Sequence, residues 1–446
     1  MMTRKQTLIE LAHKHYDYMV DVRRHLHRHP EVSYHEYETT EFIVQELEPL
    51  GFRIERPLDT GCVAIIEGSE GTEMAKMAEG TAAKATSTST STSTSKRVVA
   101  LRADIDALAM EERGEAKQAF LSQNEGVAHC CGHDAHTANL LGVARILHDL
   151  KHEIRGKIVL IFQPGEEKLP GGGRLLCETG LLQREGVQEI FGLHTSPLYA
   201  PGHVAVKNGP LMARPDEFEI HLIGKGGHAA SPHETIDPMM MLAQTITQFQ
   251  TIVSRSIDPV EPAVVTIGKV QGGTAHNVIP DIVTLNGTVR TFQKSHADLI
   301  RTRMEQILKG IADGSGGHFT FNYSEGYPAV INTPASTEKV RETAREMLGD
   351  TALVEMPKAK MAGEDFSFYL QEFPGTFFYL GTGSDEADSR WSWHHPNYNV
   401  DERAFLTGAR LMAGLALSSE TGIMRAAEAS AAGSSTNGSS GEGEAG

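Results

Sequence analysis

Short apolar runs alternate with amphipathic stretches along the first half of the chain. The runs at 98–104, 157–164 and 189–194 are continuous, a pattern typical of strands buried on both faces of a sheet. Between the first two, residues 134–150 repeat apolar side chains at helical spacing. This succession of strand, helix and strand predicts an α/β fold, in which helices cover a parallel sheet.

Two helices are predicted before these strands, over residues 6–29 and 35–50. Ser33 and Glu36 have the spacing of a capping box at the start of the second helix. Gly51 is suited to end that helix, because glycine readily adopts the left-handed conformation found after a helical C-terminus.

A low-complexity segment at 68–97 divides two β-like runs, 62–68 and 98–104. We expect these runs to form a hairpin with the segment at its tip. The Ser- and Thr-rich composition cannot bury enough apolar surface to offset the entropy of ordering, so a disordered insertion is predicted. The same argument predicts a disordered tail at 426–446.

The pattern changes after residue 208. Strand-like stretches interleave with two predicted helices, at 216–226, 235–254, 263–273, 281–292 and 294–313. We therefore expect an α+β unit, two helices against an antiparallel sheet, inserted over residues 209–321. A strand-like run at 376–381 and a helix near 401–418 restore the earlier pattern. The predicted catalytic α/β domain, which would bind metal, thus comprises residues 1–208 and 322–425.

The composition narrows the class of protein. With 446 residues the chain is too long for one simple core, so two domains are expected. The formal net charge of −17 argues against a nucleic-acid partner, because phosphate contacts need clustered cations. The apolar runs are too short to cross a membrane, so no membrane partner is expected. The four cysteines show no disulfide spacing, and the charged N-terminus does not resemble a secretory leader, which favours the cytoplasm.

Several metal-capable side chains follow the predicted strands or lie in loops. Singly, each has an ordinary explanation, such as a helix cap, a solvated loop charge or a hydrogen-bonded histidine. An open α/β sheet, however, collects the ends of its strands on one edge. Five side chains are candidate ligands: Cys131, His133, Glu167, His194 and His394. A hydrolytic zinc needs three protein ligands, so five suggest two ions, with Asp106 and Glu166 left for supporting and base roles.

These clusters resemble, in this order, the amidohydrolase branch of the di-metal aminoacylase and carboxypeptidase metallopeptidases. That branch includes hippurate hydrolases, N-acetyl-amino-acid and N-acetyl-diaminopimelate deacetylases, and plant indole-acetyl-amino-acid hydrolases. The resemblance rests on ten stretches: RRHLHRHPEVSYHEYET, LRADIDAL, HCCGHDAHTANLLG, FQPGEE, GLH, GKGGHAASPHETIDP, GGTAHNVIPD, GTVRTF, GEDFSFY and HHPNYNVDE. It implies a zinc-peptidase-like α/β catalytic domain with an inserted α+β lid that usually dimerises.

The resemblance also implies roles for single residues. Cys131 and His133 match the family's ligand pair, Glu167 and His194 match further ligands, and Glu166 matches the general base. Asp106 matches a carboxylate that orients a ligand.

The last ligand of the family lies in a Leu-His-x-Pro pattern. Here Trp393 replaces the leucine, so His394 is the match and His395 stays an alternative. Cys130 occupies a position that is commonly alanine, and we expect a buried neighbour there.

The inserted unit supplies further candidates. By resemblance, His228 is a donor to the oxyanion, often delivered across a dimer, and Asn277 is a second substrate-binding donor. Arg290 could balance a substrate carboxylate or form a structural salt bridge. The acidic pair Glu364 and Asp365 would start a helix near the site. The implied cofactors are two divalent ions per subunit, zinc or manganese, with cobalt also suitable, in a homodimer or higher homo-oligomer.

The expected activity is metal-dependent hydrolysis of N-acyl-L-amino acids to a carboxylic acid and an amino acid. A carboxypeptidase or dipeptidase of the same superfamily is the alternative, and the Cys-Gly-His pair favours the first. A non-catalytic binding protein on the same fold is a third hypothesis, against which Glu166 and His228 argue. The acyl group, the amino acid and the native metal stay open.

Overall fold

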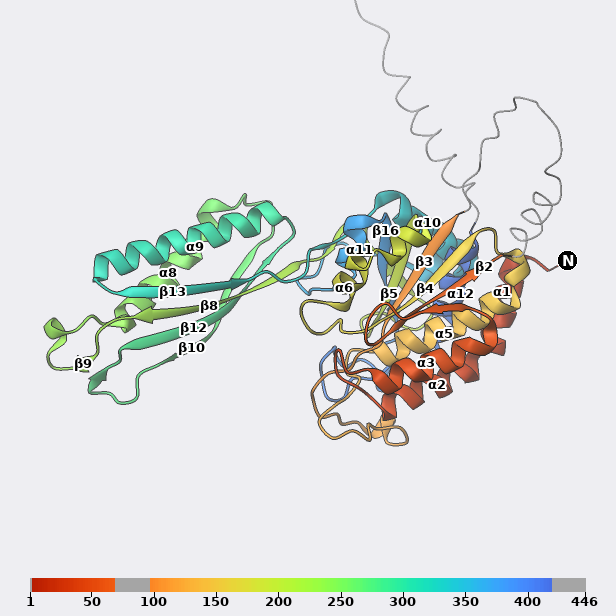
Figure 1. The fold of residues 1–446 in the computed structure, drawn as a ribbon, viewed down its shortest axis with the longest axis horizontal. Coiled ribbons are helices and arrows are strands. Elements are labelled where there is room, and N and C mark those ends of the chain that lie inside the picture. Colours follow the sequence, from red (N-terminus) through yellow and green to blue (C-terminus); the bar gives the residue numbers. More distant parts are fainter. Residues whose placement is uncertain (1, 69–96, 419–446) are drawn as a thin grey trace, which may run out of the picture.

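The computed structural model describes residues 2–68 and 97–418. Nearly all of the predicted insertion at 68–97 and the whole of the tail at 426–446 lie outside these ranges. Figure 1 shows two parts, a larger one around an eight-stranded sheet and a smaller one around a four-stranded sheet, joined by extended segments. Strands of the larger sheet come from before and after the smaller part in the sequence.

The larger sheet is mixed, with four neighbouring parallel strands at its centre, β4, β3, β5 and β16. Its strands, in spatial order, are β1 (Arg53–Glu55), β2 (Cys62–Glu67), β4 (Lys157–Gln163), β3 (Val98–Asp104), β5 (Glu189–Ser196), β16 (Gly375–Gly381), β6 (Val204–Val206) and β15 (Leu353–Glu355). The predicted run at 98–104 coincides with β3. The expected α/β class is confirmed, because helices cover both faces of this sheet.

Alternate side chains along the central strands enter two separate apolar cores. In β3, Val99 and Leu101 belong to one core, while Val98 and Ala100 belong to the other. The first core is covered by α1 (Arg4–Lys14), α2 (Tyr16–Arg28), α3 (Tyr37–Leu47), α5 (His133–Asp149), α10 (Pro334–Leu348) and α12 (Ala404–Leu417). The second is covered by α6 (Gly172–Glu178), α7 (Leu181–Glu185) and α11 (Ser367–Glu372). Burial on both faces explains why these strands are apolar throughout.

The smaller part has an antiparallel sheet with helices on one face. Its strands, in spatial order, are β10 (Val264–Gly272), β12 (Ile282–Thr291), β8 (Arg214–Ile223) and β13 (His318–Ser324). Helices α8 (Pro238–Ser256) and α9 (Lys294–Ser315) share a core with this sheet. A two-stranded ribbon, β9 (Gly227–His228) with β11 (Val278–Ile279), lies beyond it. Another short pair, β7 (Gly209–Met212) with β14 (Val330–Asn332), belongs to the larger part.

The predicted hairpin between 62–68 and 98–104 is wrong. Strand β4 lies between β2 and β3, antiparallel to the first and parallel to the second. The two runs are therefore not neighbours, because the apolar β4 pairs with both. The helix predicted at 6–29 is divided into α1 and α2 at His15, whose backbone (φ −100°, ψ 7°) leaves the helical region.

The predicted capping box is also wrong. Ser33 donates a hydrogen bond to Asp106 (2.7 Å), and Glu36 accepts from Thr60 and from the Gly165 amide (both 2.8 Å). Both side chains thus form hydrogen bonds with loops around the strand ends and do not cap the helix. Gly51 does end this helical segment, with φ +68°.

The domain limits at 208/209 and 321/322 stay predictions. Leu211 and Met212 pack in the second core of the larger part, and Phe319, Phe321 and Tyr323 pack against the core of the smaller part. Within residues 2–68 and 97–418, no helix has the length and apolar character needed to cross a membrane.

Candidate metal and catalytic site

The parallel strands bring the predicted polar clusters to one edge of the larger sheet. Asp104 is the last residue of β3, His194 lies near the end of β5, and Glu166 follows β4. Helix α5 begins at His133 on the same edge, after Gly132 with φ +99°. A side chain at Gly132 would meet Thr195 and Tyr398, so this turn requires glycine. Local turn geometry therefore fixes where the Cys-Gly-His pair lies.

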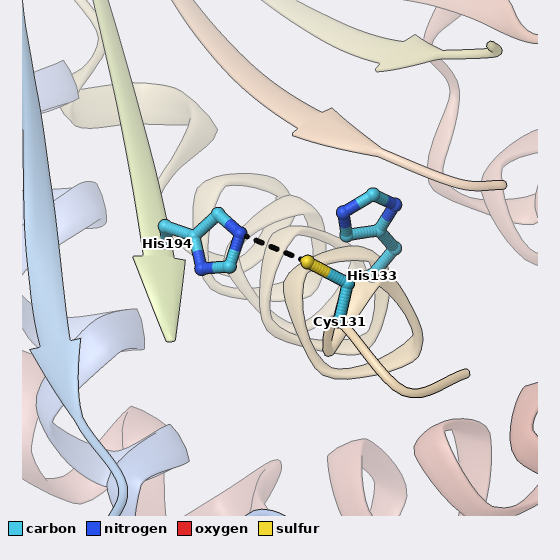
Figure 2. A group of neighbouring side chains, drawn as sticks. All are labelled: Cys131, His133 and His194. Atoms are coloured by element: carbon cyan, nitrogen blue, oxygen red, sulfur yellow. Dashed lines mark hydrogen bonds between the residues drawn. The ribbon is translucent and has the colours of Figure 1, made fainter. Parts of the chain in front are cut away.

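Cys131, His133 and His194 form a buried cluster whose donor atoms all lie within 4.8 Å of one another (Figure 2). The Sγ atom of Cys131 is 3.4 Å from Nε2 of His194. Nδ1 of His194 donates to the Thr195 carbonyl at 2.8 Å, which leaves its Nε2 lone pair free to face the cysteine. This tautomer is the one that a metal ligand needs.

Asp106 holds His133 in the corresponding orientation. Nδ1 of His133 donates to the Asp106 carboxylate and carbonyl, both at 3.0 Å. The other ring nitrogen, Nε2, is buried and has no hydrogen-bond partner among the described residues. Burial opposes ionisation of Asp106, but the hydrogen bond from His133 and that from the Glu167 amide hold its pKa below the usual range. The Asp106 carboxylate therefore fixes the Nδ1 side of His133 and directs Nε2 into the cluster.

Two further donor groups connect Glu167 and His394 to this cluster. One comprises Cys131, Glu167 and His394, and the other His133, Glu166 and Glu167. Nε2 of His394 is 3.2 Å from Oε1 of Glu167. The structure thus brings all five predicted ligands and the predicted base to one place.

The two adjacent histidines after Trp393 differ in direction. The amide of His394 donates to the Cys130 carbonyl at 2.8 Å, and its side chain reaches Glu167. His395 instead accepts from the Asn397 amide through Nδ1, and its ring stacks on Trp391 with centroids 4.4 Å apart. Geometry therefore favours His394 over His395 as the donor.

Two side chains beside the cluster are hydrogen-bonded or buried by the rest of the protein. His136 donates to Asp104 through Nδ1 (2.5 Å) and accepts from the Thr195 amide through Nε2 (2.9 Å), so neither nitrogen is free. Cys130 is fully buried in the first core, and burial raises the pKa of its thiol to about 12. Cys130 is thus a buried neighbour of the cluster, as expected.

A fully buried guanidinium lies among the carboxylates behind the cluster. Arg102 contacts Asp104 (2.6 Å), Asp365 (2.8 Å) and Glu364 (3.0 Å), and donates to Gln163 (2.9 Å). Arg102 was not among the predicted site residues. The available sign was a charged residue in an otherwise apolar buried strand, which requires partners. Through these ion pairs, Arg102 connects β3 to the segment that carries Glu364.

Glu166 is buried among like charges. Burial raises its pKa well above the usual range, and Glu364, Glu167 and Asp365 raise it further. Its carbonyl accepts a hydrogen bond from the Tyr327 hydroxyl at 2.7 Å. A carboxylate with raised proton affinity is suited to accept and return a proton near neutral pH.

A cavity of about 450 Å³ opens beside these groups. It is lined by Cys131, Glu166, Glu167, His194, Met212, Pro215, Glu217, Arg290, Tyr327, Ala362, Gly363, Glu364, Tyr379, Trp393 and His394. Arg290 comes from β12 of the smaller part. It donates to the side chain of Thr288 and to the backbone, and no described carboxylate lies within salt-bridge distance. Its guanidinium is thus available to an anionic ligand.

The structure of one chain does not bring His228 and Asn277 to this cavity. Both are exposed and belong to the β9–β11 ribbon and the turn before it, at the far end of the smaller part (Figure 1). They are close to each other, since the Ala229 amide donates to the Asn277 carbonyl at 3.1 Å.

Residues 100–418 match the model of peptidase family M20/M25/M40. The chain belongs to this peptidase family. It is 39% identical over 390 residues to the N-acetyl-L-cysteine deacetylase of Bacillus subtilis, covering 87% of this chain and 85% of that one. It is 40% identical over 311 residues to the N-acyl-L-amino acid amidohydrolase of Geobacillus stearothermophilus, covering 70% and 76%.

The crystal structure of a Bacillus subtilis protein described as a dinuclear metal binding peptidase from the M20 family matches with a TM-score of 0.72. Its sequence is 34% identical, and the match covers 90% of this chain and 97% of that one. The resemblance to the di-metal metallopeptidases is confirmed, and the chain is a hydrolase of amide bonds.

Replacing Arg102, the buried guanidinium, should lower the free energy of unfolding. Arg102→Met would leave Asp104, Glu364 and Asp365 without their common counter-charge, and removing one partner of a buried ion pair typically costs about 3–5 kcal/mol. Urea unfolding at neutral pH measures the loss. Arg174→Met is the control, because the pair of Arg174 with Glu178 is exposed and its loss should cost below about 0.5 kcal/mol. Equal stability of the two variants would contradict the structural importance of Arg102.

Proposed function

We propose that the protein hydrolyses the amide bond of N-acyl-L-amino acids, releasing a carboxylic acid and a free amino acid. The observation that carries this proposal is the convergence of five metal-capable donors and the buried Glu166 on one cavity. The names of relatives that are 39% and 40% identical support the same reaction.

The donor set fits two divalent ions. Cys131, His133, Glu167, His194 and His394 would hold them. The fit is supported by Nε2 of His133, which is buried and has no hydrogen-bond partner among the described residues. Thiolate and imidazole favour zinc, while the carboxylate keeps manganese and cobalt suitable. When bound, such ions supply Lewis-acid polarisation of the amide carbonyl and make a water molecule easier to deprotonate.

The chain's own groups then account for the proton transfers. Glu166 accepts the proton of the attacking water at its carboxylate and returns it to the leaving nitrogen. Asp106 keeps His133 in the ligand orientation through the 3.0 Å hydrogen bond. Arg290, which forms no ion pair with a carboxylate in the described part of the chain, pairs with the α-carboxylate of the amino-acid moiety.

A carboxypeptidase or dipeptidase activity is the second candidate, because Arg290 would equally accept the C-terminal carboxylate of a peptide. The test compares the rates at which the protein hydrolyses N-acyl amino acids and free dipeptides with the same C-terminal residue. Each measurement is made with zinc, manganese and cobalt in turn. Faster hydrolysis of the dipeptides would overturn the first proposal.

We further propose that the chain acts as a homodimer or higher homo-oligomer through the smaller part, with His228 and Asn277 completing the site of a neighbouring subunit. What supports this is their exposure on the β9–β11 ribbon and in the turn before it, away from the cavity of their own chain. The cytoplasmic location stays a prediction.

Glu166→Gln should abolish nearly all turnover while keeping the metal content. The carboxamide preserves the shape but accepts no proton at neutral pH, and loss of a general base typically costs about 10²–10⁴-fold. Steady-state kinetics and metal analysis of the same preparation measure both effects. Near-wild-type turnover would exclude Glu166 as the base.

The two adjacent histidines should differ in metal binding. His394→Ala should bind fewer ions per subunit, because Glu167 loses its neighbouring donor. His395→Ala should keep the wild-type content, since its ring stacks on Trp391. Metal analysis after dialysis against a weak chelator distinguishes them, and the reverse order would assign the ligand to His395.

His228→Ala should keep its melting temperature but lose about 10²–10³-fold in turnover if it donates to the oxyanion. If the donor acts between subunits, mixing this variant with Glu166→Gln under subunit exchange should restore activity, because mixed dimers contain one complete site. Exchange is verified with differently labelled subunits. No restoration despite exchange would exclude donation from a partner.

A further inference from the structure

The cavity has a wall that none of the roles proposed so far uses. Apart from Glu217 on β8, its metal-capable and acidic lining comes from the strand ends and loops already described. Most of the remaining lining is apolar or aromatic: Met212, Pro215, Tyr327, Ala362, Tyr379 and Trp393. In pockets for small molecules such surface takes up the apolar part of the ligand, while a few polar groups fix its orientation.

Trp393 is held rigidly in this wall. Its indole N–H donates to the Thr195 carbonyl at 2.9 Å. Its ring packs edge-on against His194, with centroids 5.5 Å apart and planes at 86°. Because Trp393 also directly precedes His394, the ring has a fixed position relative to the proposed metal ligands.

A lysine braces Trp393 and Tyr379 together. Nζ of Lys360 lies 4.2 Å from the centroid of Trp393 and 4.7 Å from that of Tyr379. Among the described residues this ammonium group has no ion pair within 4.0 Å, and it faces the two rings at cation–π distance. The rings are 5.9 Å apart and inclined by 32°, so the buried Tyr379 packs against the indole of Trp393.

The size of the cavity is compatible with a bulky acyl group. A volume of about 450 Å³ exceeds what an acetyl group on a small amino acid needs. An aromatic acyl group would bury its ring against Trp393, and an offset or edge-to-face arrangement of the two rings would add to the stabilisation from the buried area.

We propose that Trp393 is a specificity-determining residue whose indole contacts the acyl group, and that the preferred substrates are N-acyl amino acids with a flat aromatic acyl group. This inference rests on the proposed function, since it names the acyl class cleaved at the same site.

The first test compares two substrates of one amino acid, N-benzoyl and N-acetyl. The quantity measured is the ratio of their kcat/KM values, in which losses of folded protein or bound metal cancel. Wild type should prefer the benzoyl substrate by about tenfold or more, because the phenyl ring buries more apolar area and packs against the indole. Trp393→Leu should lower the ratio at least about fivefold, whereas Trp393→Phe, which keeps a ring, should retain more of the preference.

The chain offers a matched control, because it contains two tryptophans. Trp391 is two residues away but stacks on His395, donates to Asp388 at 3.0 Å and does not line the cavity. Trp391→Leu should leave the benzoyl-to-acetyl ratio unchanged.

Fluorescence gives a readout that does not depend on turnover. In the Glu166→Gln background, Trp391→Phe leaves Trp393 as the single reporter, and Trp393→Phe leaves Trp391. N-benzoyl amino acid should change the emission of Trp393 and not that of Trp391.

A wild-type preference for the acetyl substrate, a fall of less than about fivefold in Trp393→Leu, or an equal fall in Trp393→Phe would overturn the inference. An unchanged Trp393 emission at saturating benzoyl substrate would do the same. If wild type cleaved no N-acyl amino acid at all, the proposed function would fail, and the emission of Trp393 alone would decide whether the indole contacts an aromatic acyl group.

Discussion

The guanidinium of Arg102 makes it possible to bury so many carboxylates at one sheet edge. Asp104, Glu364 and Asp365 all contact it, and all three are buried. Uncompensated charges in such a place would take up protons or leave the interior. With Arg102 as a permanent cation, Asp104 keeps a pKa well below its usual range despite burial, and can therefore accept from His136.

The same electrostatics explain why Glu166 differs from Asp106, while burial raises the pKa of Glu364 and Asp365 as well. Glu166 lacks a permanent cationic partner among the described residues, so burial and the surrounding negative charge raise its pKa, whereas Asp106 is held low by donated hydrogen bonds. Environments that separate the proton affinities of nearby carboxyl groups allow one to stay charged and another to exchange protons. One edge of a sheet thereby contains both structural carboxylates and a candidate base.

Much of the fold followed from local patterns, because strands buried on both faces are continuously apolar and end in polar residues. β3 and α5 lie where the sequence predicted them, within one residue. The donors Cys131, His133 and His194 converge because parallel strands share an edge, which the order of elements already implied. Local patterns did not predict which strands are neighbours in the sheet, because the position of β4 between β2 and β3 depends on pairing between distant segments.

The less predictable parts of the site also depend on distant contacts. The role of Ser33 became clear only from its contact with Asp106, which is 73 residues away along the chain. The distance of His228 from its own cavity depends on how far the smaller part extends, and no residue pattern records that length. Trp393 was visible as an unusual neighbour of a histidine, but only Lys360 and Tyr379 show that it belongs to a wall.

The hydrogen bond from Tyr327 to the Glu166 carbonyl couples the two parts of the molecule mechanically. Tyr327 follows β13, the last strand of the smaller sheet, by only three residues. The link between the parts is thus not a slack tether, because its end is anchored on the loop that carries the candidate base. A rotation of the smaller part about its connecting segments would load this anchor, and with it the loop that carries Glu166.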